Sequence, residues 1–498
     1  MKQFQFLSKS KYIAGLQCLK LLWMYYHAED EFPPTDSATQ AVFNQGYLVN
    51  DLAHSLFPGG IEIPGTTEYD KILRESQSLL SCRKPLFEAA FKYENTYARA
   101  DVLNPRRNGT WDLFEVKSSA GVKDVYLPDV AFQKYCYEGA GLKINKAYVV
   151  HINNRYIKSG TINSEELLVR KDVTRGIRSF FREVKTQLKK MMRILGEKKC
   201  PCVKIGPHCD TPYPCPLKEI CWDFVPKESV FAFNRIQKVK AFRMIHSGVL
   251  KIQDVKQVYS LSSSQKIQWI CHRENRIHIN APGVQEFLRR LRFPIHFLDF
   301  ETVGTAIPFY DQSRPFQQIP FQFSLHILSG WDREAVHHSF LAEGKEDPRP
   351  EFLSALKSQI EGKGTILSYN MSFELGRLKD CVEIYQEYRE WVEGIKDRFM
   401  DLIVPFRRFD YYDPKQMGRT SIKNVFPALT GGSYEGMGIF EGEMASNEFA
   451  RITFVEGISA EERNRVRGHL EEYCKLDTQA MIDILKVLKS AAEGKGGL

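Results

Sequence analysis

The stretch from Arg99 to Tyr137 constrains the fold more than any other part of the chain. It begins RADVLNPRRNGTWDLFEVKSS and ends VAFQKYCY. Alternate side chains of a strand share a face, so Glu115 and Lys117 are expected to point the same way. The economical explanation is a divalent cation held by Asp101 and Glu115, with Lys117 positioning or activating an attacking water. For Glu115-Val-Lys117 taken alone, the alternative is a surface ion pair.

Length, composition and charge bound the class of protein. A chain of 498 residues is expected to form two or three domains, and 43% hydrophobic with 26% charged residues describes a soluble globular protein. The net charge of +8 is compatible with a polyanionic partner. The chain lacks an uncharged apolar run of membrane-spanning length and a signal-peptide core, so we expect a cytoplasmic protein without a membrane partner. An ATP-driven motor is not supported, because no Gly-x-x-x-x-Gly-Lys-Ser/Thr loop is present.

The pattern of apolar residues divides the chain into three parts. Residues 1–226 indicate an α/β domain, residues 227–290 a connector of short helices, and residues 291–490 a second α/β domain. In the first part, strands are expected at about 61–63, 86–91, 97–103, 111–116 and 147–152, and helices at about 40–58, 130–139 and 173–195.

A glutamine and a tyrosine follow the Lys117 motif on one helix. Gln133 and Tyr137 lie four residues apart and therefore share a face. Together with Asp101, Glu115 and Lys117, they resemble the motifs of the PD-(D/E)XK nucleases of the RecB-like branch. The resemblance implies a restriction-endonuclease-like fold in which these five residues are catalytic. It also implies Mg²⁺ or Mn²⁺ at the two acids.

The cysteines point to a metal centre in the same domain. Eleven cysteines in a reducing compartment are not expected to form disulfides. Cys18 stands alone near the start, whereas Cys209, Cys215 and Cys221 follow one another with five-residue gaps. One early and three late thiolates supply the four ligands of a [4Fe–4S] cluster. Such a cluster would cross-link the two ends of the domain.

This split pattern resembles that of the CRISPR-associated and AddB-type nucleases. Alternatives to the cluster remain open. Zinc, with His208 available, is the rival metal, and plain buried cysteines are the simplest reading. Cys200 and Cys202 are candidates to replace Cys209 as the first late ligand.

One residue departs from the pattern of these nucleases. They carry Gly-x-x-x-His on an early helix, whereas this chain has Gly46-Tyr-Leu-Val-Asn50. The asparagine offers a carbonyl oxygen but is a weaker ligand than imidazole. Asp51 and His54 are the neighbours considered as compensation, although Asp51 points about 100° away on a helix.

A second acidic constellation lies in the last third of the chain. Asp299 and Glu301 share a face of an apolar strand, where two like charges repel unless a cation lies between them. Glu374 follows a strand that enters a helix at Asn370. Tyr473 and Asp477 lie one helical turn apart.

In this order the motifs look like those of the DnaQ-type 3′→5′ exonucleases of the RNase H-like fold. The resemblance implies that four acids hold two divalent ions about 3.5–4 Å apart and that Tyr473 orients the water. The four acids are Asp299, Glu301, Glu374 and Asp477. Glu374 stands where the family usually has Asp, and Asp401 is expected to be a supporting metal ligand.

Basic and aromatic residues also cluster between these motifs. Arg419 and Lys423 are either phosphate contacts or a solvated face. Four aromatic residues stand beside Arg407 and Arg408: Phe406, Phe409, Tyr411 and Tyr412. Stacking on single-stranded bases and simple packing against the protein are equally favoured for them.

The order of a split-cysteine nuclease, a helical connector and a DnaQ-like domain resembles a prokaryotic family known only as a domain of unknown function. Leu7-Ser-Lys-Ser-Lys and Ile319-Pro-Phe-Gln-Phe-Ser add to the resemblance. We therefore expect a metal-dependent nuclease acting on DNA ends or single strands in repair, recombination or defence. The alternatives are a nucleic-acid-binding scaffold with degenerate centres and an RNA-processing 3′→5′ exonuclease.

Overall fold

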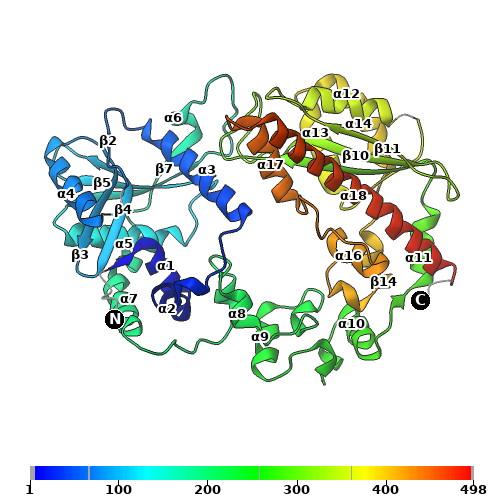
Figure 1. The fold of residues 1–498 in the computed structure, drawn as a ribbon, viewed down its shortest axis with the longest axis horizontal. Coiled ribbons are helices and arrows are strands. Elements are labelled where there is room, and N and C mark those ends of the chain that lie inside the picture. The colour runs from blue at the N-terminus through cyan, green and yellow to red at the C-terminus, as the bar shows by residue number, and fades with distance from the viewer. Residues whose placement is uncertain (1–5, 66–67, 257, 361, 495–498) are drawn as a thin grey trace. The chain divides into compact units, whose positions relative to one another are not determined.

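The computed structural model describes residues 6–65, 68–256, 258–360 and 362–494. The chain is a mixed α/β protein that forms two compact units, each with its own sheet (Figure 1). Unit 1 comprises residues 1–224 and 305–316, and unit 2 comprises residues 225–304 and 317–498. In the described part of the chain, no helix is both long and apolar enough to cross a bilayer. Residues 1–4, which were used to judge the signal peptide, lie outside the described residues.

Unit 1 is built on a mixed seven-stranded sheet. Six strands run in the order β2-β3-β4-β5-β6-β7, and β1 pairs with β4. Strands β3, β4 and β5 form an antiparallel meander, whereas β6 is parallel to β5. The strands are β1 (Leu7–Ser8), β2 (Ile61–Glu62), β3 (Leu86–Tyr93), β4 (Thr96–Pro105), β5 (Trp111–Lys117), β6 (Ile144–Ile152) and β7 (Leu168–Asp172).

Helix α5 (Tyr126–Gly139) makes the crossover from β5 to β6 and packs on the sheet. Tyr12 stacks on Phe132 of α5 at 4.6 Å between ring centroids, which joins the N-terminal helix to this core. The basic helix expected at 173–195 is α7 (Arg178–Leu195), with its apolar stripe buried and its lysines exposed. The other helices of unit 1 are α1 (Lys9–Gln17), α2 (Leu19–His27), α3 (Ser37–His54), α4 (Tyr69–Leu79), α6 (Ser164–Leu167) and α8 (Lys218–Trp222).

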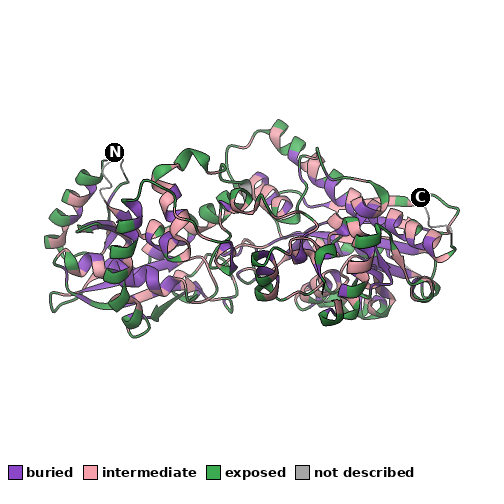
Figure 2. Ribbon diagram, turned by 90° about the horizontal axis from the view of Figure 1, so that it is seen from below, coloured by how far each residue is buried: buried purple, intermediate pink, exposed green. Residues whose placement is uncertain are grey.

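Unit 2 contains a mixed five-stranded sheet in the order β11-β10-β9-β12-β13. Strand β10 is antiparallel to β9 and β11, whereas β12 is parallel to β9 and β13. In both units the inner strands are buried along most of their length, whereas the edge strands β7 and β11 are largely exposed or half-buried (Figure 2). The strands are β9 (Ile295–Val303), β10 (Ile319–Leu328), β11 (Val336–Leu341), β12 (Thr365–Ser368) and β13 (Phe399–Asp401).

The two faces of this sheet differ in chemistry. Leu298 and Phe300 of β9 face an apolar core made with α12 (Arg349–Gln359), α13 (Ser372–Val382) and α14 (Arg389–Ile395). The alternate residues face α18 (Ala460–Ala492): Gln322 donates to the Leu470 carbonyl at 2.9 Å, and the hydroxyl oxygens of Ser324 and Thr478 lie 2.7 Å apart. The polar alternation of β9 and β10 therefore turns acids towards one long helix.

The helices expected to form a connector pack as part of unit 2. Strand β8 (His278–Ile279) pairs with β14 (Tyr411–Tyr412), and His272 Nε2 lies 3.0 Å from the Tyr412 hydroxyl. All four aromatic residues from Phe406 to Tyr412 are buried, so the packing interpretation replaces the base-stacking one. The remaining helices are α9 (Lys238–His246), α10 (Ser263–Glu274), α11 (Ala281–Arg289), α15 (Val404–Arg407), α16 (Ile422–Thr430) and α17 (Gly442–Phe454).

Candidate functional sites

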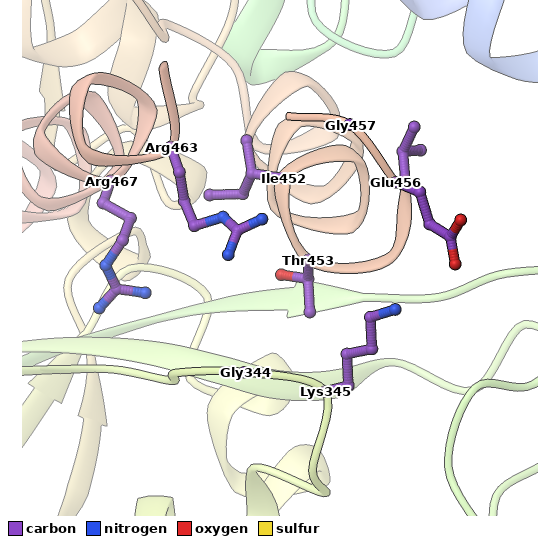
Figure 3. A pocket seen from close by; sticks show the side chains of 9 residues that line it. Gly344, Lys345, Ile452, Thr453, Glu456, Gly457, Arg463 and Arg467 are labelled. Carbon is purple, nitrogen blue, oxygen red and sulfur yellow. The ribbon is translucent and has the colours of Figure 1, made fainter. Parts of the chain in front are cut away.

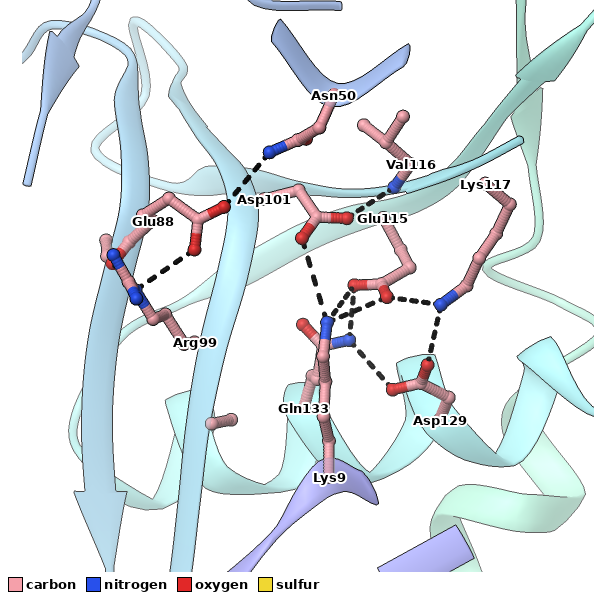
Figure 4. A network of polar contacts seen from close by, with 12 residues as sticks. Lys9, Asn50, Glu88, Arg99, Asp101, Glu115, Val116, Lys117, Asp129 and Gln133 are labelled. Carbon is pink, nitrogen blue, oxygen red and sulfur yellow. Dashed lines mark hydrogen bonds and ion pairs between the residues drawn. The ribbon is translucent and has the colours of Figure 1, made fainter. Parts of the chain in front are cut away.

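The structure brings Asp101, Glu115 and Lys117 together where β4 and β5 pair (Figure 4). Asp101 Oδ2 accepts the backbone N–H of Val116 at 2.6 Å, which fixes its carboxylate beside that of Glu115. Glu115 is only 1% exposed and therefore needs partners for both oxygens. We call this acid–amine cluster the first centre.

Helix α5 contributes Asp129 and Gln133 to the first centre. Lys117 Nζ donates to Glu115 at 2.6 Å and to Asp129 at 3.1 Å. Gln133 Nε2 donates to the same two carboxylates, at 2.6 and 3.0 Å. Gln133 thus lies in the site as predicted, whereas the Tyr137 hydroxyl donates to the Ala89 carbonyl of β3 at 2.7 Å and packs in the core.

A second amine reaches the first centre from the start of α1. Lys9 Nζ lies 2.8 and 3.0 Å from the two oxygens of Glu115 and 3.7 Å from Asp101 Oδ1. The sequence analysis did not assign this residue to the site. Its partner in the chain is 106 residues away, so no local pattern signals the contact.

Asn50 approaches the first centre from α3, at the position where the resembling family has His. Its Nδ2 donates to Glu88 Oε1 at 3.0 Å, and its Oδ1 is buried without a hydrogen-bond partner. Glu88 adopts a left-handed φ of 59° within β3, a strained conformation for a residue with a side chain. Neither proposed substitute joins Asn50, because Asp51 is exposed and His54 stacks on Phe87.

Charge in the first centre is compensated by its amines. Burial and the Glu115 carboxylate raise the pKa of Asp101 to about 7. Burial opposes the charge of Glu115, but Lys117 and Lys9 hold its pKa well below the usual value. Burial also opposes the charge of Lys9, yet Asp101, Glu115 and Asp129 raise its pKa well above the usual value.

The donors of the first centre fit a hard divalent ion. Carboxylate oxygens and the unpartnered Asn50 Oδ1 are the ligand atoms that Mg²⁺ and Mn²⁺ prefer. Both oxygens of Glu115, however, already accept hydrogen bonds from lysine or glutamine nitrogens. A metal ion here therefore has to share or displace an ammonium partner.

The second centre lies between β9 and α18. One ligand atom each from Asp299, Glu301 and Cys474 lies within 4.8 Å of the others. Cys474 Sγ donates to Asp299 Oδ2 at 3.8 Å. Asp477, one turn after Tyr473 on α18, accepts the Tyr434 hydroxyl at 2.6 Å. The cysteine and Tyr434 are members of the site that the sequence analysis missed.

Glu374 is the acid of this centre whose carboxylate is least satisfied by the protein itself. It is 2% exposed at the start of α13, and its Oε2 has no hydrogen-bond partner. A buried unpaired carboxylate oxygen is costly unless a ligand satisfies it. Asp401, expected as a metal ligand, instead accepts the backbone N–H groups of Asn370 and Ile403 at 2.8 and 3.1 Å. In this state it supports the turn that leads to Glu374.

Burial dominates the electrostatics of the second centre. Burial and the charges of Asp477 and Glu301 raise the pKa of Asp299 well above the usual value. Burial raises the pKa of Glu301 to about 8, with Asp477 adding to the shift. Burial likewise raises the pKa of Glu374 to about 8 and that of Asp477 to about 6. The Lys423 ammonium partly offsets the shifts of Glu301 and Asp477, and its Nζ lies 4.8 Å from the Tyr473 ring centroid.

These shifts predict how pH changes the stability of the metal-free chain. The fold keeps protons on Glu301 and Glu374 up to about pH 8, whereas the unfolded chain releases them near 4.5. Stability is therefore complete below the unfolded value and falls as the pH rises through the folded value. In EDTA, Tm should decrease from about pH 5.5 to about pH 8.5, and Mg²⁺ should restore it most at the higher pH.

The double variant Glu301→Gln, Glu374→Gln is the control for this titration, because it removes both ionisations. Its Tm should change less with pH than that of the wild type, as followed by circular dichroism. A wild-type Tm that stays constant in EDTA over this range, or an equal Mg²⁺ effect at both ends, contradicts the assignment.

Four cysteines line one pocket in unit 1, as the split pattern predicts. They come from the α1–α2 junction, the segment before α8 and α8 itself: Cys18, Cys209, Cys215 and Cys221. Cys209 Sγ accepts the backbone N–H of Gly206 at 3.5 Å. Gln17 Nε2 ties the two parts together by donating to the carbonyls of His208 and Tyr213, both at 2.8 Å.

The alternative ligands lie at the edge of this pocket or outside its lining. His208 lines it, whereas Cys200 and Cys202 are exposed and do not. The four thiols predicted as ligands therefore line one pocket, and neither Cys200 nor Cys202 takes the place of Cys209 in that lining. Gln17, which precedes the first of them, was not identified.

A further hollow of about 300 Å³ lies beside the end of α17 and the start of α18 (Figure 3). Lys345, Arg463 and Arg467 line it. Arg467, however, donates to the carbonyls of Ala342 and Leu341 at 2.7 and 3.2 Å. This guanidinium therefore holds the end of β11 against α18, which is a structural role.

Comparison with known proteins concerns mainly the second centre. Residues 296–421 match the family described as "Domain of unknown function (DUF2779)". The chain contains a DUF2779 domain. The matched segment includes Asp299, Glu301, Glu374 and Asp401 and ends before Tyr473. The resemblance to a domain-of-unknown-function family is thus confirmed for this segment.

Three uncharacterised proteins of Mycoplasma and Ureaplasma species are distant homologues. The uncharacterized protein MG366 homolog of Mycoplasma pneumoniae is 27% identical over 212 residues, which is 39% of this chain and 32% of that protein. Uncharacterized protein MG366 of Mycoplasma genitalium is 28% identical over 211 residues, or 38% of this chain and 31% of that protein. Uncharacterized protein UU173 of Ureaplasma parvum is 29% identical over 167 residues, which is 32% of this chain and 24% of that protein. The matches span about a third or less of these relatives.

Proposed function

We propose that the chain is a metal-dependent nuclease of the cytoplasm that hydrolyses DNA ends or single strands in repair, recombination or defence. One observation carries the proposal: four carboxylates from three elements, three of them buried and Asp299 half-buried, converge in the second centre with little positive charge nearby. They are Asp299, Glu301, Glu374 and Asp477. Such a cluster is stable only with protons or with divalent cations.

The topology of each unit supports the proposal. In chain order, the sheet of unit 2 runs 3-2-1-4-5 with its second strand antiparallel, an order typical of the RNase H-like fold. In unit 1, an antiparallel meander followed by a helix and a parallel strand is typical of the PD-(D/E)XK core. Asp101 and Glu115 lie within the neighbouring strands β4 and β5, and Asp299 and Glu301 lie within β9, the central strand of its sheet.

In the second centre, Mg²⁺ or Mn²⁺ would be held by the four carboxylates and would supply Lewis acidity and a water of lowered pKa. The chain's own residues do the positioning. Tyr473 borders Asp477 and is placed to orient the attacking water. The charge of the Lys423 ammonium acts on both Glu301 and Asp477, which suits a phosphate contact.

In the first centre, Asp101 and Glu115 would hold the ion. Lys117, fixed by Asp129 and Glu115, is placed to position water at the phosphate. Gln133 orients Glu115.

A [4Fe–4S] cluster fits the cysteine pocket better than zinc. Tetrahedral zinc with bonds of about 2.3 Å places its sulfurs about 3.8 Å apart. Among the described residues, no three of these four thiols come within 4.8 Å of one another. Four thiols spaced around a pocket therefore suit a larger, multi-iron group.

Lys117→Ala tests the first centre. We expect cleavage there to fall by about 10²-fold or more while the fold persists, because the lysine acts on water rather than on the core. The measurement is nicking of double-stranded DNA by the full chain in an Asp299→Asn background. Lys123→Ala, an exposed lysine in the loop after β5, is the matched control. Undiminished nicking in Lys117→Ala refutes the assignment.

The proposal as a whole is tested with labelled DNA and RNA, single- and double-stranded, incubated with Mg²⁺ or Mn²⁺. Degradation of DNA that EDTA stops supports it. Degradation confined to RNA selects the RNA-processing alternative. Binding without cleavage, weakening with salt, selects a scaffold with degenerate centres, the alternative that Asn50 and the compensated charge of the first centre favour.

A further inference from the structure

The two centres differ in what neutralises their acids. In the first centre, Lys9 lies between the two carboxylates expected to hold the metal, as Figure 4 shows. In the second centre, no lysine or arginine of the described residues forms an ion pair with Asp299 or Asp477. The same kind of acid pair is thus bridged by an ammonium in one unit, whereas in the other only the more distant Lys423 charge acts on it.

The Lys9 ammonium takes the place that a chelated ion needs. It lies within 3.0 Å of both Glu115 oxygens and also faces Asp101 Oδ1. The opposite oxygen of Asp101 is already committed to the Val116 N–H. A divalent ion that bridges Asp101 and Glu115 would therefore meet a positive charge at the shared position.

Helix α1 holds the Lys9 backbone in place, whereas the side chain is free to rotate. Ser8 caps α1 by accepting the Lys11 N–H at 3.4 Å, β1 pairs with β4, and Gln17 at the far end of α1 donates to the His208 and Tyr213 carbonyls. The backbone of α1 is thus anchored at both ends. The Lys9 side chain is 28% exposed, so rotation into solvent needs no movement of the helix.

We propose that Lys9 is a resident counter-ion that competes with the divalent metal for Asp101 and Glu115 and so sets the metal concentration at which the first centre becomes active. The inference rests on the proposed function of that centre. Under this inference, the first centre binds the divalent metal only at a higher metal concentration than the second centre does. Lys9 is thus a positioning residue that acts through the metal ligands.

Direct measurement of metal binding tests this. Mn²⁺ is titrated calorimetrically into the full chain, purified with its native cofactors, in an Asp299→Asn, Asp477→Asn background that weakens the second centre. Lys9→Met should bind Mn²⁺ at the first centre about tenfold to a hundredfold more tightly than the parent. Lys9→Arg, which keeps the charge, should bind as weakly as the parent. Lys11→Met, a change on the same helix whose ammonium lies over the Tyr25 ring, is the matched control.

Thermal unfolding gives a second readout. Without metal, Lys9→Met should unfold at a lower temperature than the parent, because Glu115 loses a partner, and Mn²⁺ should raise its Tm by more. If Lys9→Met does not fold, tighter binding by Lys9→Arg than by the parent still overturns the proposal, and equal binding supports it.

The outcomes separate this inference from the proposed function. Unchanged Mn²⁺ affinity in Lys9→Met, with DNA nicking that depends on Lys117, overturns the competition and leaves the nuclease intact. If neither the parent nor Lys9→Met binds Mn²⁺ at Glu115, as a Glu115→Gln variant reports, the competition fails together with the first metal site. If Lys11→Met tightens Mn²⁺ binding as much as Lys9→Met does, the cause is a remote charge effect, and this result also overturns the competition.

Discussion

Asp299→Asn is expected to abolish stepwise shortening of a 3′ end, with a fall in rate of about 10³-fold or more, while nicking by the first centre persists. Asp299 lies beside Glu301 and Cys474, and its charge couples to Asp477 and Glu374. The amide removes one negative ligand from the middle of the cluster. The product ladder of end-labelled single-stranded DNA measures the effect.

The same change should stabilise the metal-free fold, which separates a lost ligand from a damaged core. Buried like charges repel, so removal of one raises Tm in EDTA at about pH 8. The exposed Asp397→Asn in the same unit is the control and should leave both the ladder and Tm unchanged. A wild-type ladder from Asp299→Asn counts against two separate centres.

Cys18→Ser is expected to release the cluster and destabilise unit 1. The anaerobically purified wild type should be brown and contain about four irons per chain. Cys18 lies between α1 and α2, whereas its three proposed partners lie in the segment before α8 and in α8 itself. A cross-link over a loop of this length contributes about 5 kcal/mol in the chain-entropy estimate, so its loss should lower the Tm of unit 1 strongly.

Iron content, visible absorbance and thermal unfolding measure this prediction. Cys82→Ser, at an exposed cysteine of the same unit, should keep the iron, the colour and the Tm. Zinc in place of iron, without charge-transfer absorbance, rules the cluster out. Full iron content in Cys18→Ser contradicts the assignment of the early ligand.

Local patterns predicted the elements that carry the sites. The alternation at Glu115 and Lys117 gave the correct face of β5, and the four-residue spacing placed Gln133 beside Glu115. These predictions depend on neighbours within one strand or helix, where the chain geometry fixes direction. Asp129 lies one helical turn before Gln133, so the same four-residue spacing also indicated that it faces Glu115, but it was overlooked.

Contacts between distant segments were not predictable in this way. Lys9 meets Glu115 across 106 residues, and Tyr434 meets Asp477 from a loop that has no motif. Tyr137 shares a face with Gln133, yet its length carries the hydroxyl past the site to a backbone carbonyl. The burial of Phe406 depends on unit 2 helices that the sequence pattern indicated only as a connector.

The most direct test of the account is the anomalous diffraction of crystals of the full chain soaked in Mn²⁺. The account predicts anomalous peaks bonded to carboxylate oxygens of Asp299 and Asp477, with the free Glu374 oxygen turned to the same ions. DNA hydrolysis by a chain whose acids show no bound metal at saturating Mn²⁺ would contradict it.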